Sequence, residues 1–238
     1  MWAIVPIKSL DQAKQRLASV LSGDERRSLM LALARDVLTA LAQSRQLTGV
    51  LIVSRTPEAD ALAQTFATER FRETPDADLP TSLAQASRYL QRQFASRGDL
   101  IVPADLPLLT ADAVDRLIEA HLSKSSETGA VTVVPDDARI GTNALLCSPP
   151  GCIDYLFDGR SFKPHVDAAY AKGITPTIAQ PLEIDLDIDT PDDLRALLRR
   201  GPGTQTHTYL ERSGIADRLR ADQHDRDDAN PSDPPSTP

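Results

Sequence analysis

The sequence predicts a single α/β domain in which helices flank a mostly parallel central sheet. Short apolar runs alternate with longer stretches of helical periodicity, which is the order of a wound parallel sheet. Aromatic residues make up only 4% of the chain while alanine, leucine, isoleucine and valine are abundant, and this composition suits helices packed on a sheet better than a β-sandwich. With 238 residues, the chain is long enough for one such domain and a tail.

Short apolar runs locate the strands of this sheet. Residues 100–102 lie between Asp99 and Pro103, and an apolar run bounded in this way is typical of a strand buried on both faces. The other predicted strands cover residues 2–7, 49–53, 70–74, 130–134 and the end of 139–146.

Capping signals predict where the helices begin. Ser22 and Glu25 have the spacing of a capping box, which opens a long helix through residue 41. Thr190 and Pro191 fit the cap and the first position of a helix that ends near residue 200. Further helices are expected to end near residue 67, to cover 81–96 and 111–123, and to follow Ser161 as a cap.

The domain is expected to cover residues 1–200. Residues 201–220 allow one more short C-terminal helix. Residues 221–238 are rich in Asp, Pro and Ser and offer almost nothing to bury, so they are predicted to form a disordered tail.

Composition excludes several classes of function. A net charge of −8 argues against a broad basic surface, so no nucleic-acid partner is expected. No apolar stretch approaches the ~18 residues of a membrane span, and the chain enters its first strand without a basic leader. Cys147 and Cys152 lack a metal-ligand pattern and are predicted to be free thiols in a reducing compartment. The protein is therefore expected to be cytoplasmic, with no membrane partner.

Asp105 follows the strand at 100–102. Ligands of open α/β sheets bind outside the carboxyl ends of the strands, so this carboxylate is well placed to hold a metal or a ribose. The alternative is that Asp105 only shapes a turn.

A second acidic focus lies at residues 182–194. In an extended chain Asp185, Asp187 and Asp189 would share one face, with apolar residues on the other. Like charges at this spacing repel unless solvent or a cation relieves them, and Mg²⁺ prefers one or two carboxylates together with substrate phosphates. The pattern indicates a magnesium site, and a solvent-facing edge strand is the alternative.

Two sets of residues could bind anions. Lys8, Lys14 and Arg16 follow the first strand, and cations in that place suit phosphate, although their spacing alone is also that of a solvated surface turn. The second set comprises Gly141, Thr142, Arg160 and Ser161. Their amides, hydroxyls and guanidinium could hold an anion, although turns and a helix cap also account for these residues.

Taken together, these stretches resemble one family, the guanylyltransferases of deazaflavin coenzyme F-420 biosynthesis. This family is known as CofC in archaea and includes the phosphoenolpyruvate guanylyltransferase of actinobacteria. The resemblance covers about residues 2–200 in order, and its motifs are residues 5–8, 13–17, 35–38, 104–108, 141–145, 161–165 and 187–194.

The resemblance implies a single nucleotidyltransferase domain of the glycosyltransferase-A-like kind. The family transfers GMP from GTP to the phosphate of a three-carbon phosphoacid and releases pyrophosphate. The acceptors are 2-phospho-L-lactate, phosphoenolpyruvate or 3-phospho-D-glycerate. The partners expected from it are GTP, the phosphoacid and Mg²⁺, and a homodimer is a family-level expectation.

Roles are carried over by position. Asp105, Asp187 and Asp189 match the metal-binding carboxylates, and Thr142 and Ser161 match residues that hold the acceptor. The basic loop over the GTP phosphates corresponds to Lys8, Lys14 and Arg16. His165 is either an additional phosphate contact or a buried helix histidine.

The chain departs from the family pattern in two places. Many members have Gly at the position of Asp158, whereas here the glycine is Gly159, beside Arg160, and this altered pocket favours 3-phospho-D-glycerate as acceptor. Near the nucleotide, Pro80 replaces an Asn of relatives and cannot supply the same amide hydrogen bonds.

Three other functions compete with this interpretation. A molybdopterin-cofactor nucleotidyltransferase would have a glycine-rich first loop, which is missing here. A nucleotide-sugar glycosyltransferase is compatible with the Asp-x-Asp patterns at 185–187 and 187–189. The third is a nucleotide-binding protein without catalytic activity.

Overall fold

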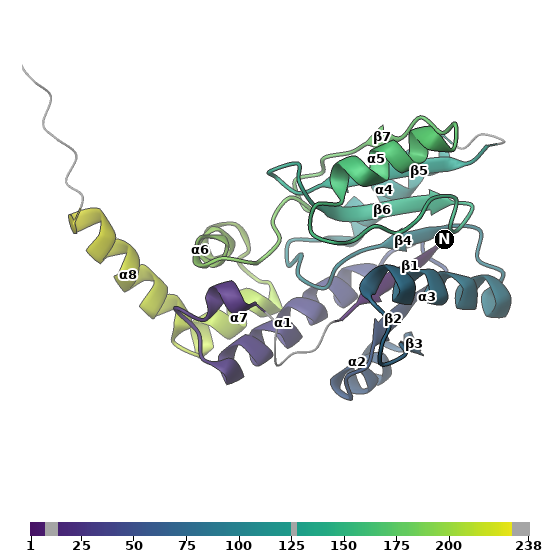
Figure 1. Ribbon diagram of the computed structural model, residues 1–238. Helices are drawn as coiled ribbons and strands as arrows, with labels where there is room; N and C mark the ends of the chain where they lie inside the picture. Colours follow the sequence, from purple (N-terminus) through teal and green to yellow (C-terminus); the bar gives the residue numbers. More distant parts are fainter. Residues whose placement is uncertain (8–13, 125–127, 230–238) are drawn as a thin grey trace, which may run out of the picture.

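The central sheet has seven strands in the order β3-β2-β1-β4-β6-β5-β7 (Figure 1). The computed structural model describes residues 1–7, 14–124 and 128–229, with 223–229 as backbone alone. Within these ranges β6 is antiparallel to both neighbours and the other strand pairs are parallel, so the predicted mostly parallel sheet is confirmed. The strands are β1 (Trp2–Pro6), β2 (Gly49–Ser54), β3 (Glu69–Arg72), β4 (Asp99–Ile101), β5 (Ala130–Pro135), β6 (Thr142–Ser148) and β7 (Thr177–Ile178).

The reversed direction of β6 follows from the tight turn that precedes it. The Asp136 carboxylate closes this turn by accepting hydrogen bonds from the amides of Ile140 at 2.7 Å and Gly141 at 2.9 Å. Consecutive strands joined by so short a connection pair as an antiparallel hairpin. As a result β6 begins at the same edge of the sheet at which β4 and β5 end, and this edge carries the candidate site.

Most helices begin where their capping residues predict. Ser22 with Glu25 and Thr190 with Asp193 form complete capping boxes, and Asp78 caps a helix that starts two residues earlier than expected. The helices are α1 (Gly23–Ala42), α2 (Glu58–Phe66), α3 (Leu79–Phe94), α4 (Ala111–Leu122), α5 (Phe162–Ala171), α6 (Pro191–Arg200), α7 (Gln205–Arg212) and α8 (Ile215–Ala229).

Alternate residues of each central strand enter two different cores. In β1, Ala3 and Val5 pack with α1, α2 and α4, whereas Trp2 and Ile4 pack with α3 and α5 on the opposite face. This two-residue alternation is the geometry of a strand buried on both sides. The domain therefore has three layers, helix, sheet and helix (Figure 1).

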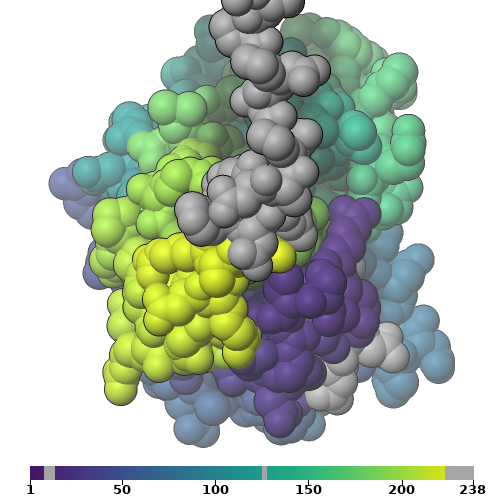
Figure 2. Space-filling view, turned by 90° about the vertical axis from the view of Figure 1, so that its left-hand side faces the viewer, coloured from purple at the N-terminus to yellow at the C-terminus, as the bar shows by residue number. Residues whose placement is uncertain are grey.

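Helices α7 and α8 belong to the domain. Asp36 in α1 accepts hydrogen bonds from the amides of Gln205 and Thr206 at 2.7 and 2.9 Å, and so caps α7. Ile215 and Leu219 of α8 are buried in the same core as α1. Figure 2 shows the yellow α8 beside the purple segment that leads into α1.

Two expectations about the C-terminal region are corrected by these helices. The domain does not end at residue 200, and two helices follow where one was expected. Because α8 continues to Ala229, the disorder predicted from residue 221 is wrong for this stretch, and residues 230–238 lie outside the described chain. No helix in the described ranges is both long enough and apolar enough to cross a membrane.

A buried histidine on the side of the domain away from the candidate site predicts a specific pH dependence of stability. His121 in α4 is fully buried, with its ring nitrogens 2.9 Å from the hydroxyls of Thr132 and Ser148. Burial lowers its pKa from 6.5 to about 4. The unfolded chain therefore binds the extra proton first, and this contribution to stability is lost as the pH falls below 6.5.

The effect can be isolated with His121→Gln, which does not titrate. Between pH 7 and pH 4.5 the wild type should lose about 2 kcal/mol more unfolding free energy than this variant. Urea unfolding at both pH values measures the difference. Equal losses in the two proteins would contradict the assignment.

Candidate active site

Two acidic segments that are far apart in the sequence meet at the carboxyl edge of the sheet. Asp105 lies in the loop after β4, and its carbonyl oxygen accepts a hydrogen bond from the Ile188 amide at 3.2 Å. Ile188 is fully buried and fixes the segment that carries Asp187 and Asp189. The predicted convergence of the two acidic foci is therefore present in the structure.

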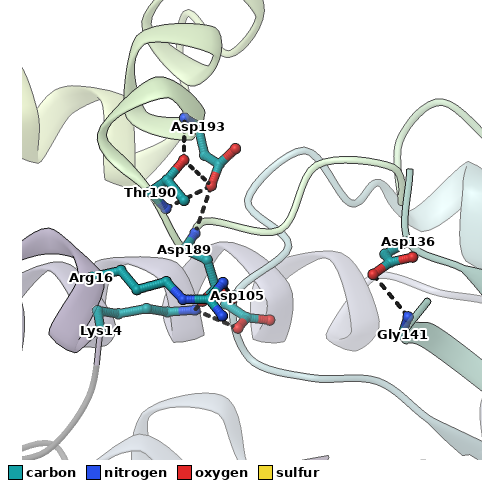
Figure 3. Close-up of polar contacts among 8 residues, drawn as sticks. All are labelled: Lys14, Arg16, Asp105, Asp136, Gly141, Asp189, Thr190 and Asp193. Atoms are coloured by element: carbon teal, nitrogen blue, oxygen red, sulfur yellow. Dashed lines mark hydrogen bonds and ion pairs between the residues drawn. The ribbon is translucent and has the colours of Figure 1, made fainter. Parts of the chain in front are cut away.

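Lys14 joins these segments to the N-terminal loop (Figure 3). Its Nζ donates to Asp105 Oδ2 at 2.6 Å and to Asp189 Oδ1 at 2.7 Å, and only 6% of its side chain is exposed. Burial lowers the pKa of Lys14, but the two carboxylates raise it more, so the net pKa lies above the ordinary lysine value. The ammonium group is therefore a permanent positive charge between two carboxylates.

Arg16 adds a second cation at the rim of this cluster. Its Nη1 lies 3.9 Å from Asp189 Oδ2, and 75% of its side chain is exposed. The short 3-10 helix Gln15–Leu17 carries it, and Leu17 is fully buried, which anchors the turn. Lys8, the remaining predicted phosphate contact, lies outside the described residues.

Asp187 completes the acidic group. Burial, and next the charges of Asp105 and Asp189, raise its pKa to about 6. Asp185 lies apart, because its carboxylate pairs with Arg200 at 2.7 Å. Residues 182–189 do not form a strand, so the expected row of three aspartates is wrong for Asp185. Of the alternating apolar residues, Ile184 and Ile188 are buried and Leu186 is half-buried.

The carboxylates fit a magnesium ion by their chemistry. Among the described residues, no three histidine, cysteine or acidic side chains are already gathered around one point as metal ligands. Asp105 and Asp189 nevertheless direct one oxygen each at a single cation, the Lys14 Nζ. Mg²⁺ needs only one or two carboxylates when substrate phosphates and water supply its other ligands.

Sequence reasoning missed a residue that orients this cluster. The Asp193 carboxylate accepts hydrogen bonds from the Asp189 amide at 2.9 Å and from the Thr190 amide at 2.6 Å. It therefore fixes the backbone from which the Asp189 side chain extends. The Thr-x-x-Asp capping box was the signal that could have identified it.

The residues expected to hold the acceptor come from the starts of β6 and α5. Thr142 and Ser161 are nearly buried, and the Phe162 amide donates to the Ile140 carbonyl at 3.0 Å, which ties the two segments together. Ser161 occupies the capping position of α5, but its side chain makes no capping hydrogen bond, contrary to its predicted role.

The loop before α5 is open at its tip. Gly159 has a φ of +88°, a conformation that favours glycine, and nothing lies within 4 Å of the space a side chain would fill. Asp158 accepts a hydrogen bond from the Arg160 amide at 2.9 Å, and both side chains are exposed. The shifted glycine thus lies in a tight turn that leads directly into Ser161.

His165 does not have a nitrogen available for phosphate. Its ring is fully buried, with Nδ1 3.0 Å from the Thr142 hydroxyl and Nε2 2.8 Å from the Leu156 amide. The predicted phosphate contact is therefore wrong in this structure, and the alternative of a buried helix histidine holds.

A further contact connects the two halves of the edge. The Asn143 side chain donates to the Ile184 carbonyl at 2.8 Å, which holds the acidic segment against the start of β6. Figure 3 shows the turn formed by Asp136 and Gly141 across the same edge from the Lys14 cluster. The site therefore combines carboxylates and cations on one side with hydroxyls and a glycine turn on the other.

Comparison with solved structures identifies the fold. A protein from Desulfovibrio desulfuricans G20 that is assigned as a nucleotide-diphospho-sugar transferase superposes with a TM-score of 0.70 at 18% identity. The match covers 92% of this chain and 96% of that one. A cytidylyltransferase from Leptospira borgpetersenii gives a TM-score of 0.58 at 11% identity, covering 92% and 95%. These likenesses confirm the expected nucleotidyltransferase fold.

Comparison with known sequences identifies the family. The phosphoenolpyruvate guanylyltransferase of Sphaerobacter thermophilus is 37% identical over 84% of this chain and 93% of its own length. The 2-phospho-L-lactate guanylyltransferase of Methanobrevibacter ruminantium is 30% identical over 90% of this chain and 92% of its own length. Residues 1–227 match the family described as Guanylyl transferase CofC like. The chain therefore belongs to the CofC-like family of guanylyltransferases, which are nucleotidyltransferases.

Proposed function

We propose that this protein transfers GMP from GTP to the phosphate of a three-carbon phosphoacid in coenzyme F-420 biosynthesis. The observation that carries the proposal is the position of Lys14 between Asp105 and Asp189, at the edge where Thr142 and Ser161 also lie. Cations and carboxylates in one place suit a triphosphate with its metal. The relatives named above are guanylyltransferases, which supports GTP as the donor.

Phosphoenolpyruvate is the acceptor we favour. The relative with 37% identity is named for phosphoenolpyruvate, and the one with 30% identity for 2-phospho-L-lactate. These names do not support 3-phospho-D-glycerate, which the shifted Gly159 favoured in the sequence. Phosphoenolpyruvate and 2-phospho-L-lactate both carry a phosphate beside a carboxylate, so one site with two anion contacts could recognise either.

The reaction requires alignment and charge neutralisation more than proton transfer. An oxygen of the acceptor phosphate attacks the α-phosphorus of GTP, the bond between the α-phosphorus and the bridging oxygen breaks, and pyrophosphate leaves. Because the attacking phosphate is already an anion, no strong general base is needed.

The residues of this edge divide that work. Lys14, Arg16 and Lys8 would pair with the triphosphate, and Thr142, Ser161 and the Gly159 turn would bind the acceptor. Magnesium would be held by Asp105, Asp187 and Asp189, and when bound it would neutralise charge on the phosphates.

Pyrophosphate release tests this proposal and separates it from its alternatives. GTP, Mg²⁺ and each of the three phosphoacids would be combined in separate reactions, and then repeated with ATP and CTP. We expect release with GTP and phosphoenolpyruvate. A nucleotide-sugar glycosyltransferase releases a nucleoside diphosphate, and a non-catalytic binding protein releases nothing, so either result would reject the proposal. The homodimer and the cytoplasmic location stay predictions.

A further inference from the structure

His165 fixes the direction of the Thr142 hydroxyl through its own tautomer. The Leu156 amide is a donor, so Nε2 of the ring, 2.8 Å away, must accept and carries no hydrogen. The single hydrogen of the neutral ring is therefore on Nδ1, which donates to the Thr142 oxygen at 3.0 Å. With that oxygen accepting from the ring, the Thr142 hydrogen is left to point toward another acceptor.

The ring is held in this state by its surroundings. Its side chain is fully buried, and the Phe157 ring packs against it at a tilt of 61°, with the ring centroids 4.9 Å apart. Burial lowers the pKa of His165 to about 4, although the charge of Asp158 opposes the shift, so the imidazole is neutral at pH 7. The ring therefore keeps one donor and one acceptor throughout the physiological range.

The two hydrogen bonds of His165 connect both segments of the acceptor side. One reaches the start of β6 at Thr142, and the other reaches Leu156, where the loop toward Gly159 and Ser161 begins. A hydroxyl that can only donate recognises an anionic oxygen and discriminates against a donor in the same place. This is the polarity that a phosphate or carboxylate oxygen of a phosphoacid requires.

We propose that His165 is a positioning residue for the phosphoacid. It orients the Thr142 hydroxyl so that this group donates a hydrogen bond to an anionic oxygen of that substrate. This inference rests on the proposed function, in which Thr142 binds the acceptor. His165 itself touches neither substrate.

Two substitutions separate the two hydrogen bonds of the ring. In His165→Gln the longer amide side chain can place its oxygen near the Nε2 position, which keeps the acceptor for Leu156 and loses the donor to Thr142. In His165→Asn the amide nitrogen can occupy the Nδ1 position, which keeps the donor to Thr142. We expect His165→Gln to raise KM for the phosphoacid about tenfold, with kcat and KM for GTP within about twofold of the wild type. In His165→Asn the KM for the phosphoacid should lie close to the wild-type value.

His121→Gln is the matched control. His121 is equally buried and also contacts two partners through its ring nitrogens, but these lie away from the site. A similar loss of melting temperature without any change in the phosphoacid KM would separate positioning from general stability. In a Thr142→Val background, His165→Gln should produce no further rise in KM.

The outcomes are distinguishable. An unchanged phosphoacid KM in folded His165→Gln, or an equal rise in His121→Gln, would overturn the role of His165 and leave the proposed function intact. If His165→Gln does not fold, His165→Asn provides the test. A rise of about tenfold in both its phosphoacid KM and its KM for GTP would also overturn the role of His165. A wild-type protein that turns over none of the phosphoacids would overturn both inferences.

Discussion

Replacing Asp105 by Asn is expected to lower kcat/KM for GMP transfer by about 1,000-fold. The amide keeps the size of the side chain but removes a charge that faces Lys14 at 2.6 Å and, in our proposal, the magnesium ion. Rates of pyrophosphate release at saturating and limiting Mg²⁺ would measure the loss, and titration calorimetry with Mg²⁺ and GTP would show weaker metal binding.

Asp185→Asn is the matched control for this substitution. Asp185 belongs to the same acidic run but pairs with Arg200 at 2.7 Å, so its loss should change kcat/KM by less than about threefold. Equal effects of the two substitutions would contradict the assignment of Asp105 to the metal site. An Asp105→Asn protein with wild-type activity would contradict it more directly.

Replacing Lys14 by Met is expected to reduce kcat/KM for GTP by about 100-fold, because a fixed positive charge on the triphosphate would be lost. The same change should lower the free energy of unfolding in metal-free buffer by about 2 kcal/mol, since two facing carboxylates lose their shared counter-ion. This value is below that of a fully buried pair because the Asp189 side chain is 44% exposed and partly screened by water.

Added Mg²⁺ should restore part of this stability in Lys14→Met, because the metal supplies the missing positive charge. Urea unfolding with and without Mg²⁺ measures the recovery. Lys163→Met provides the control, since Lys163 is 80% exposed and pairs with Asp167 on the surface of α5. If Mg²⁺ stabilised the Lys14 and Lys163 variants equally, the carboxylates facing Lys14 would not be its binding site.

Local patterns in the sequence were sufficient for most of the fold. The apolar run at 100–102, the capping box at Ser22 and the cap at Thr190 depend on residues within one turn or one strand, and the structure has each where expected. The direction of β6 depends on a tight turn closed by Asp136, which hydrophobic alternation does not report. Hydrophobic alternation identifies the buried face of a strand but does not indicate whether the strand runs parallel or antiparallel to its neighbours.

The candidate site was predictable in composition but not in geometry. Asp105 and Asp189 were found from their positions in the sequence. The ion pairs of Lys14 were not, because they join it to carboxylates 91 and 175 residues away and depend on how the loops fold. The carboxylate of Asp185 turns toward Arg200 because residues 182–189 do not form the expected strand.

The packing of α8 and the hydrogen bonds of His165 were not predicted, for a related reason. Few residues of α8 are apolar, and Ile215 and Leu219 become a buried face because α8 packs against α6 and α7 in the core that they share with α1. His165 belongs to the motif at 161–165, but its hydrogen bond to Thr142 joins residues that lie 23 apart in the sequence. Contacts of this kind are determined by the tertiary structure and cannot be predicted from the local periodicity of the sequence.

The most direct test of GMP transfer follows the α-phosphorus of GTP. GTP labelled at that atom would be incubated with the protein, Mg²⁺ and phosphoenolpyruvate, and the products separated and identified by mass. We predict that the label appears in a conjugate of GMP and phosphoenolpyruvate, with an equal amount of unlabelled pyrophosphate. Label that is recovered only as free GMP, or that stays in GTP with each of the three phosphoacids, would contradict the assignment of this protein as a guanylyltransferase of phosphoacids.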